Sequence, residues 1–353
     1  MTPRLTIIVP AYNEAHRLGA GMRRLEAAAA AGAVDLEHTR VVVVDDGSTD
    51  GTAAVAEKLL APFPHHRVLR LPFNQGKGAA VRVGVAEARS RYTAYMDADM
   101  AIDPLAVPLL LDGLETSDVA IGSRALRDSM VETTYVVRSL MGRLFNEIVT
   151  AGTGLGLKDT QCGFKAFRTP VARLLFHLVR IDRFAFDVEV LARARRLGLA
   201  ITEVPVQWKH VEGSTVHPLH DSVTMLADVY RSRYGFLSTP PVPAIIVRED
   251  AGVAGAPGSA GQAGGSGPLM ERVGKVVADS LDGVPVPLVG RGPSVTVLLP
   301  LVEPADAATV FSGLRAEFPS LEVSRRSLTL DALAGLGTLA GQLRAATDPS
   351  GMG

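Results

Sequence analysis

The chain has 353 residues, of which 47% are hydrophobic, and its 36 basic residues nearly balance its 37 acidic residues. This length exceeds one average domain, and the balanced charge gives no sign of nucleic-acid binding. The single cysteine, Cys162, excludes an internal disulfide and a cysteine-rich metal site.

The N-terminus enters a strand pattern at Arg4, without the charged and apolar regions of a signal peptide. No stretch approaches 18 uncharged apolar residues, and the apolar region 140–157 is interrupted by Arg143, Glu147 and several glycines. We therefore expect a cytoplasmic protein that does not span a membrane by itself.

Residues 4–122 alternate between short β-branched runs and helical periodicity, which is typical of a parallel sheet with crossover helices. Helices are expected after Asn13 and after Ser48, each a candidate N-cap, and from Gly78 onward. The expected strands cover residues 5–9, 41–44, 68–71, 94–96 and 118–122.

The segment 124–234 is less regular and is expected to form a lid or acceptor half attached to the half formed by residues 4–122. Its patterns predict helices over 136–149, 170–178 and 186–197 and a strand over 201–208.

Residues 251–268 are almost entirely Gly, Ala, Ser and Pro, a composition that predicts a flexible linker. The expected domains are therefore 1–240, a linker over 251–268, and a small C-terminal domain of unknown function over 269–353. Within the last, residues 295–301, 305–318 and 321–328 favour a small β-α-β unit.

Polar loops follow four of the predicted strands. Ligands of open α/β sheets bind outside the carboxyl ends of the strands, so these loops indicate a polar site. Asp97 and Asp99 have the spacing and oxygen ligands that suit Mg²⁺ or Mn²⁺ bound together with substrate phosphates. The structural alternative is an Asx turn ahead of a helix that Asp103 caps.

The loop from Asp45 to Asp50 contains more carboxylates than one helix cap needs. Carboxylates at a strand end are costly unless they accept hydrogen bonds, which a ribose diol or a base would supply. The loop from Asn74 to Gly78 has the glycines and lysine of a phosphate loop but departs from the Walker pattern. Lys77 is therefore a candidate ligand for base or phosphate, with a solvated lysine as the alternative.

Two arginines, Arg124 and Arg138, are candidates to hold phosphates, although isolated arginines are more often surface residues. Three histidines, His210, His217 and His220, lie within eleven residues of one another. Their spacing fits no regular pair of metal ligands on a helix, so contact with an anionic acceptor is favoured over zinc.

These motifs together resemble glycosyltransferases of family 2, most closely the dolichyl-phosphate glucosyltransferase and mannosyltransferase group. The resemblance covers about residues 4–234. It rests on residues 9–14, 44–52, 74–78, 97–99 and 121–124, and residues 159–165, 186–189 and 203–208 look like the glucosyl branch in particular.

The resemblance implies an α/β GT-A (nucleotide-diphospho-sugar transferase) fold with a mostly parallel central sheet, plus the small α/β C-terminal appendage. It also implies a metal contact for Asp97 and Asp99, phosphate binding by Arg124 and Arg138, and a nucleotide pocket. The pocket would be lined by Pro10, Tyr12, Glu14, Asp46 and Lys77. Members of the group often have a third metal ligand two residues beyond the second Asp, where this chain has Ala101.

The expected activity is metal-dependent, inverting transfer of a hexose from a nucleotide sugar, UDP-glucose, to a polyprenyl or dolichyl phosphate. A phosphate acceptor is already an anion, so Asp187 is the candidate base only if one is needed. The chain would meet this acceptor peripherally, at the inner membrane surface, through Leu140, Leu144 and Ile148 if that helix is not core. Alternatives are transfer from GDP-mannose, transfer to a soluble acceptor, and nucleotide binding without turnover.

Overall fold

The computed structural model describes residues 3–132, 149–150, 153–209, 227–228, 239–248, 267–291, 293–334 and 336. The chain divides into two units, one of residues 1–168 and 179–238 and the other of residues 169–178 and 239–353. Among the described residues, no helix is both long and apolar enough to cross a membrane.

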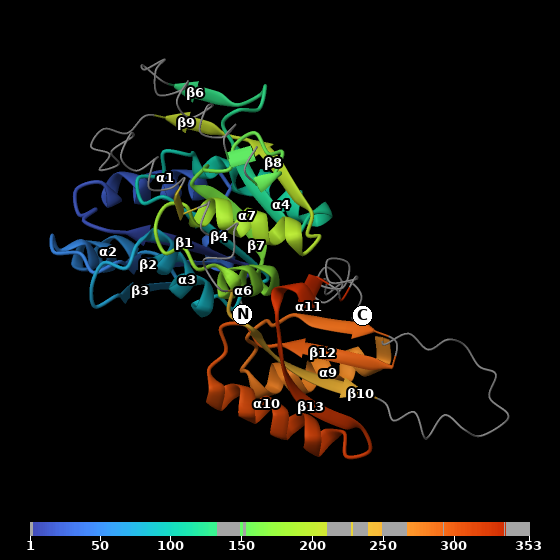
Figure 1. The fold of residues 1–353 in the computed structure, drawn as a ribbon. Helices are drawn as coiled ribbons and strands as arrows, with labels where there is room; N and C mark the ends of the chain where they lie inside the picture. Colours follow the sequence, from blue (N-terminus) through green and yellow to red (C-terminus); the bar gives the residue numbers. More distant parts are fainter. Residues whose placement is uncertain are drawn as a thin grey trace. The chain divides into compact units, whose positions relative to one another are not determined.

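The first unit is organised around a seven-stranded sheet with strand order β3-β2-β1-β4-β7-β5-β8 (Figure 1). All neighbours pair in parallel except β7, which runs antiparallel to both β4 and β5. The strands are β1 (Leu5–Ala11), β2 (Thr39–Asp45), β3 (His66–Arg70), β4 (Tyr92–Met96), β5 (Val119–Ser123), β7 (Phe164–Arg168) and β8 (Ile201–Pro205). This α/β architecture and the five strands expected before residue 124 are confirmed.

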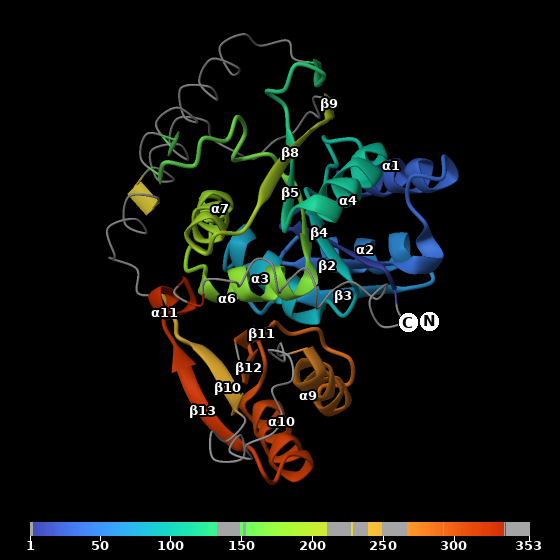
Figure 2. The ribbon, with the colours of Figure 1, turned by 90° about the vertical axis from the view of Figure 1, so that its right-hand side faces the viewer.

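Helices cover both faces of this sheet because its central strands are buried on both sides. The helices α1 (Leu18–Ala30), α2 (Thr52–Leu60) and α4 (Val107–Thr116) contribute to one apolar core with β1 and β2. On the other face lie α3 (Lys77–Glu87) and α7 (Phe186–Arg196). Figure 2 shows α4 and α7 on opposite sides of β5 and β8. Short 3₁₀ turns, η1 (Leu36–His38) and η2 (Pro104–Ala106), precede β2 and α4.

The two expected N-caps were wrong. Asn13 has a left-handed backbone (φ 54°) and lies before α1, whose preceding residue is Arg17. The Ser48 hydroxyl accepts from the Asn13 amide, while Asp50 Oδ1 accepts from the Thr52 amide at the start of α2. The side chains of Asn13 and Ser48 therefore join the loops that follow β1 and β2 instead of capping helices.

The segment after Arg124 is not a separate half, because β7 and β8 belong to the main sheet. The expected strand over 201–208 is interrupted at Val206, after which β9 (Gln207–Lys209) pairs with β6 (Met130–Glu132). The expected helix over 136–149 lies outside the described residues except for its last residue.

The C-terminal unit has a four-stranded antiparallel sheet in the order β11-β12-β10-β13. With its two main helices it follows the β-α-β-β-α-β sequence of the ferredoxin-like motif. Its elements are α6 (Thr169–Leu178), β10 (Val242–Arg248), α9 (Gly267–Ser280), β11 (Leu288–Arg291), β12 (Ser294–Leu298), α10 (Pro304–Glu317), β13 (Glu322–Leu328) and α11 (Leu330–Ala334).

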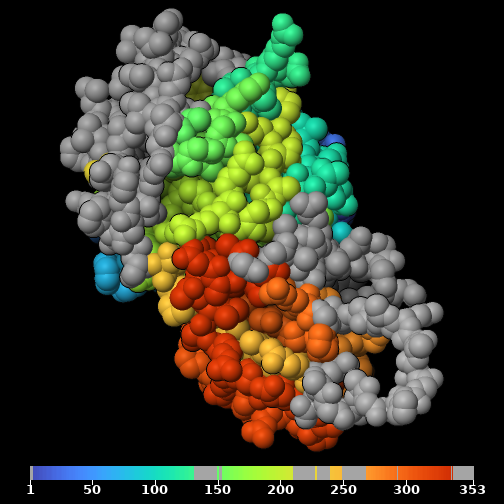
Figure 3. All heavy atoms as spheres, turned by 45° about the vertical axis from the view of Figure 1, so that its right-hand side comes forward, coloured from blue at the N-terminus to red at the C-terminus, as the bar shows by residue number. Residues whose placement is uncertain are grey.

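The core of this unit lies between the sheet and the helices α9 and α10. Ile245 and Val247 of β10 and Val295 and Val297 of β12 belong to it. In the space-filling view of Figure 3 the described atoms from residue 239 onward are the amber-to-red spheres. Because β10 precedes residues 251–268 and belongs to this sheet, the unit begins before the expected linker. The linker itself lies outside the described residues except for its last two, with which α9 begins.

Candidate functional site

A cavity of about 440 Å³ opens at the carboxyl ends of β1, β2 and β4. Parallel strands end there together, so loops far apart in sequence contribute to one wall. The structure brings seven of the sequence-predicted site residues to its lining: Pro10, Tyr12, Glu14, Asp46, Lys77, Asp97 and Asp99.

Side-chain hydrogen bonds join the loops after β1 and β2. Thr49 N donates to Asn13 Oδ1 at 3.0 Å, and Glu14 N donates to Thr52 Oγ1 at 2.9 Å. Ala15 N donates to Asp50 Oδ2 at 3.1 Å. The polar residues of the second loop thus fix the backbone around Tyr12 and Glu14, beyond any role as a helix cap.

Asp46 uses both carboxylate oxygens to hold a neighbouring loop. Its Oδ1 accepts from Gln75 N and its Oδ2 from Gly76 N, each at 2.8 Å. Burial raises the pKa of Asp46, while these two amides favour its ionised form. The protein itself therefore supplies hydrogen bonds that the sequence analysis expected from a ribose or a base.

The glycines of residues 74–78 serve close packing. The Asp182 carbonyl accepts from Gly78 N and Ala79 N at the start of α3, so the first helical amides are occupied. A β-carbon at Gly76 would lie 2.4 Å from the same carbonyl oxygen. The glycines let the segment 181–184 approach this turn, and Arg183 and Phe184 of that segment line the cavity.

Carboxylates and cations alternate along the edge formed by the β4 loop. Lys77 Nζ lies 2.5 Å from Asp97 Oδ1, and Arg17 Nη1 lies 3.7 Å from Asp99 Oδ2. Arg17 Nη2 also forms an ion pair with Glu14 Oε1. Burial opposes the charged form of Lys77, but Asp97 and then Asp187 outweigh it and raise the lysine pKa.

Negative charge at this edge is only partly compensated. Burial raises the pKa of Glu14 and of Asp99, and the Asp97 carboxylate raises both further. Glu14 Oε2 is buried, and no residue in the described part of the chain donates a hydrogen bond to it. Two carboxylates with oxygen donors facing a cavity fit a hard divalent cation. The described residues contain no set of three ligands that would enclose one.

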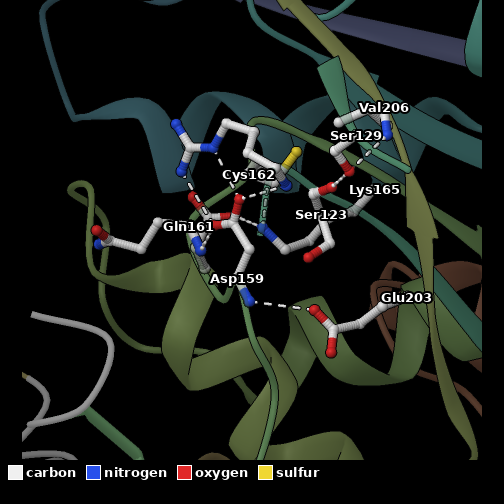
Figure 4. A network of polar contacts seen from close by, with 10 residues as sticks. Ser123, Ser129, Asp159, Gln161, Cys162, Lys165, Glu203 and Val206 are labelled. Carbon is white, nitrogen blue, oxygen red and sulfur yellow. Dashed lines mark hydrogen bonds and ion pairs between the residues drawn. The ribbon is translucent and has the colours of Figure 1, made fainter. Parts of the chain in front are cut away.

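Arg124 lies outside the cavity lining. Its Nε and Nη2 donate to Asp159 Oδ2 and Oδ1 at 2.7 and 3.0 Å. Although burial disfavours both charges, each partner stabilises the other, so the pKa of Asp159 is lowered and that of Arg124 raised. Figure 4 shows Asp159 in this network, where Asp159 N donates to Glu203 Oε1.

Asp187 is also outside the lining, and its side chain is only 6% exposed. The Tyr95 hydroxyl and the fully buried Lys165 ammonium group both donate to its Oδ1. Lys165 Nζ also donates to the Cys162 carbonyl at 2.7 Å. This environment favours a fixed ion pair over a free base. Arg138 and the histidines 210, 217 and 220 lie outside the described residues.

Three charged or aromatic residues of the lining were missed by sequence reasoning: Arg17, Arg183 and Phe184. Arg17 precedes an amphipathic helix, where arginine is ordinary. Phe184 lies far from Tyr12 in the sequence, so no local spacing relates the two residues. Phe184 is 39% exposed and Tyr12 is 44% exposed, and these exposures are known only from the folded structure.

The chain is similar in sequence to known proteins over about two thirds of its length. The model of "Glycosyl transferase family 2" matches residues 6–176. The dolichyl-phosphate beta-glucosyltransferase of Dictyostelium discoideum is 36% identical over 244 residues, covering 66% of this chain and 75% of that protein. The enzyme of the same name from Drosophila melanogaster is 38% identical over 242 residues, covering 64% and 73%.

Among solved structures, glucosyl-3-phosphoglycerate synthase from Mycobacterium tuberculosis is similar in fold. Its complex with Mn²⁺, UDP-glucose and phosphoglyceric acid has a TM-score of 0.51 and 21% identity, covering 68% of this chain and 83% of that one. Its complex with Mg²⁺ and UDP has a TM-score of 0.50 and 20% identity, covering 68% and 83%. This likeness agrees with the GT-A fold expected from the sequence.

Proposed function

Because the chain belongs to glycosyl transferase family 2, we propose that it transfers glucose from UDP-glucose to a polyprenyl phosphate, with inversion at the anomeric carbon. The names of the similar dolichyl-phosphate beta-glucosyltransferases support this sugar and this acceptor class. The observation that carries the proposal is the cavity in which aromatic rings, cations and paired carboxylates meet at the strand ends.

The residues of the cavity lining suit both parts of a nucleotide sugar. Tyr12 and Phe184 are partly exposed rings on which a base can stack. Lys77 and Arg17 are suited to the oxygens of a diphosphate. Asp46 would act mainly by holding the turn that carries Lys77.

Asp97 and Asp99 are the residues that would hold Mg²⁺ or Mn²⁺. Their oxygen donors and the only partly compensated negative charge of the edge fit such an ion, and water would complete the coordination where Ala101 offers no ligand. When bound, the ion supplies charge neutralisation at the leaving diphosphate and a template for the donor.

An acceptor phosphate is already negatively charged, so alignment of the nucleophile matters more than proton removal. We propose Arg124 and Arg138 as ligands of that phosphate. The pair with Asp159 uses Nε and Nη2 of Arg124, which leaves Nη1 to face an acceptor. The buried Asp187 would then position Lys165 and Tyr95 instead of acting as a base. The protein would meet its lipid acceptor peripherally, at the membrane surface.

The test is a transfer assay with radiolabelled UDP-glucose, GDP-mannose and dTDP-glucose, each with Mg²⁺ or Mn²⁺ and a short polyprenyl phosphate. We expect lipid-linked label only with UDP-glucose and a divalent ion. Asp99→Ala should abolish transfer, by about 100-fold or more, while the protein remains folded. Label from GDP-mannose, or label passed only to soluble hydroxyl compounds, would contradict the proposal.

A further inference from the structure

Asp97 and Asp99, the carboxylates proposed to hold the metal ion, are already paired with basic side chains of the protein. Lys77, the first residue of α3, contacts Asp97 at 2.5 Å. Arg17, which precedes α1, lies 3.7 Å from Asp99 and is paired with Glu14. These two cations come from different segments and meet at the same edge of the cavity.

The charges at this edge set the condition for metal binding. Three carboxylates, Glu14, Asp97 and Asp99, face two cations. A divalent ion on Asp97 and Asp99 would either displace Lys77 and Arg17 or lie beside two like charges, and both are unfavourable. Among the described ion pairs, Glu14 is a second partner for Arg17, whereas Asp187, the next acid that acts on Lys77, is already paired with Lys165.

A nucleoside diphosphate changes this balance because it brings negative charge together with acceptor oxygens. Lysine and arginine are both phosphate ligands, so they can leave the carboxylates for the diphosphate. We propose that Lys77 and Arg17 keep divalent cations off Asp97 and Asp99 until a diphosphate draws them away. This inference rests on the proposed function and deepens it by assigning Arg17 and Lys77 a role in the free site.

The consequence is reciprocal coupling between metal and nucleotide that runs through two identified side chains. The wild-type protein would bind Mn²⁺ weakly alone and much more tightly with UDP. Removing either cation would raise the affinity for Mn²⁺ in the absence of nucleotide, although it removes a ligand for UDP. A side chain that only binds phosphate would not have the first effect.

The experiment measures Mn²⁺ binding by electron paramagnetic resonance of the free ion, with and without UDP, in the wild type, Lys77→Gln and Arg17→Gln. Arg67→Gln is the matched control. Arg67 Nη1 lies 2.6 Å from Glu87 Oε2, and neither residue belongs to the cavity lining. We expect about tenfold tighter Mn²⁺ binding without UDP in both cavity variants, and a correspondingly smaller gain on adding UDP. The control should behave as the wild type.

Circular dichroism identifies any variant that fails to fold, and either cavity variant alone suffices for the comparison. Mn²⁺ affinity without UDP that is unchanged or lower in a folded cavity variant, alongside normal UDP and Mn²⁺ binding by the wild type, would overturn this inference alone. A wild type that binds neither UDP nor Mn²⁺, even together, would overturn the proposed function as well.

Discussion

Gly163 and Asp97 are in direct contact, and the glycine leaves no room for any other residue. A β-carbon at position 163 would lie 2.0 Å from Asp97 Oδ2 and 2.6 Å from Oδ1. Gly163 directly precedes β7, the antiparallel strand beside β4, so the insertion of β7 places a backbone wall behind the carboxylate. The orientation of Asp97 toward Lys77 therefore depends on a residue that has no side chain of its own.

We predict that Gly163→Ala displaces the Asp97 carboxylate and weakens UDP binding in the presence of Mn²⁺ by at least about tenfold, because a shift of one ligand disrupts a preorganised site. Isothermal titration calorimetry measures the effect. Gly19→Ala is the control, since the nearest atom to a β-carbon there is at an ordinary 3.6 Å. Equal affinities for the two variants would show that Asp97 is free to reorient.

Asp46→Asn should loosen the turn that carries Lys77. An asparagine has one acceptor oxygen, so its amide group would face the N–H of Gln75 or Gly76. Loss of that hydrogen bond costs about 1–3 kcal/mol, part of which would appear as about tenfold weaker UDP binding. Asp103→Asn is the matched control, because its carboxylate caps η2 through one accepted bond, from Leu105 N. An Asp46→Asn protein with wild-type affinity would refute the positioning role.

The sequence predicted those parts of the site that lie next to strongly patterned strands. Asp97 and Asp99 follow a buried strand directly, and Asp46 follows another, so local pattern and the strand-end rule were sufficient. Strand β7 was not anticipated because Phe164–Arg168 pairs with strands about 45 and 70 residues earlier in the chain, and such pairing has no local signal.

The same limit explains the misread caps and the missed cavity residues. Asn13 and Ser48 have the residue types of helix caps, but the two loops bond to each other instead, which depends on the adjacency of β1 and β2. Arg183 and Phe184 are directed to the cavity by the Asp182 carbonyl at the start of α3, a contact between segments about 100 residues apart.

Breaking the buried pair of Lys165 and Asp187 should destabilise the protein more than breaking an exposed ion pair. Lys165→Met leaves the Asp187 carboxylate without its cation, and breaking a buried pair in this way costs about 3–5 kcal/mol. Urea denaturation measures the change in the free energy of unfolding. Tyr95→Phe removes only one donor to the same oxygen and should cost about 1 kcal/mol. Comparable losses in the two variants would contradict a buried ion pair.

The pair of Arg124 and Asp159 predicts a specific dependence of stability on pH. The pKa of Asp159 is lowered from 3.8 in the folded protein, so its stabilising effect is fully present above pH 3.8 and is lost as the pH falls through the lower folded value. The difference in thermal midpoint between wild type and Asp159→Asn should therefore be largest near neutral pH and shrink below pH 3.8. For Asp112→Asn, an exposed control, we expect little difference at any pH. A difference in thermal midpoint that grows as the pH falls would contradict this prediction.

Truncation of the chain before β10 should destabilise α6, because α6 overlaps the family match but belongs to the C-terminal unit. The family match extends through residue 176, yet α6 packs with β10 in the C-terminal unit. Six apolar side chains of α6 are fully buried: Val171, Ala172, Leu174, Leu175, Phe176 and Leu178.

Polar contacts also join α6 to the rest of the C-terminal unit: Arg173 Nη2 donates to the Leu301 carbonyl at 2.7 Å, and Leu301 N donates to His177 Nδ1 at 3.3 Å. A chain ending at residue 238 lacks β10 and everything after it, so part of the apolar surface of α6 becomes exposed. Each Val, Leu or Phe side chain that is fully returned to water costs about 1.5–3 kcal/mol of stability. We expect low soluble yield or a markedly lower thermal midpoint for this truncation, and a smaller drop for Arg173→Met in the full chain. An unchanged midpoint for the truncated protein would show that α6 does not depend on the rest of the C-terminal unit.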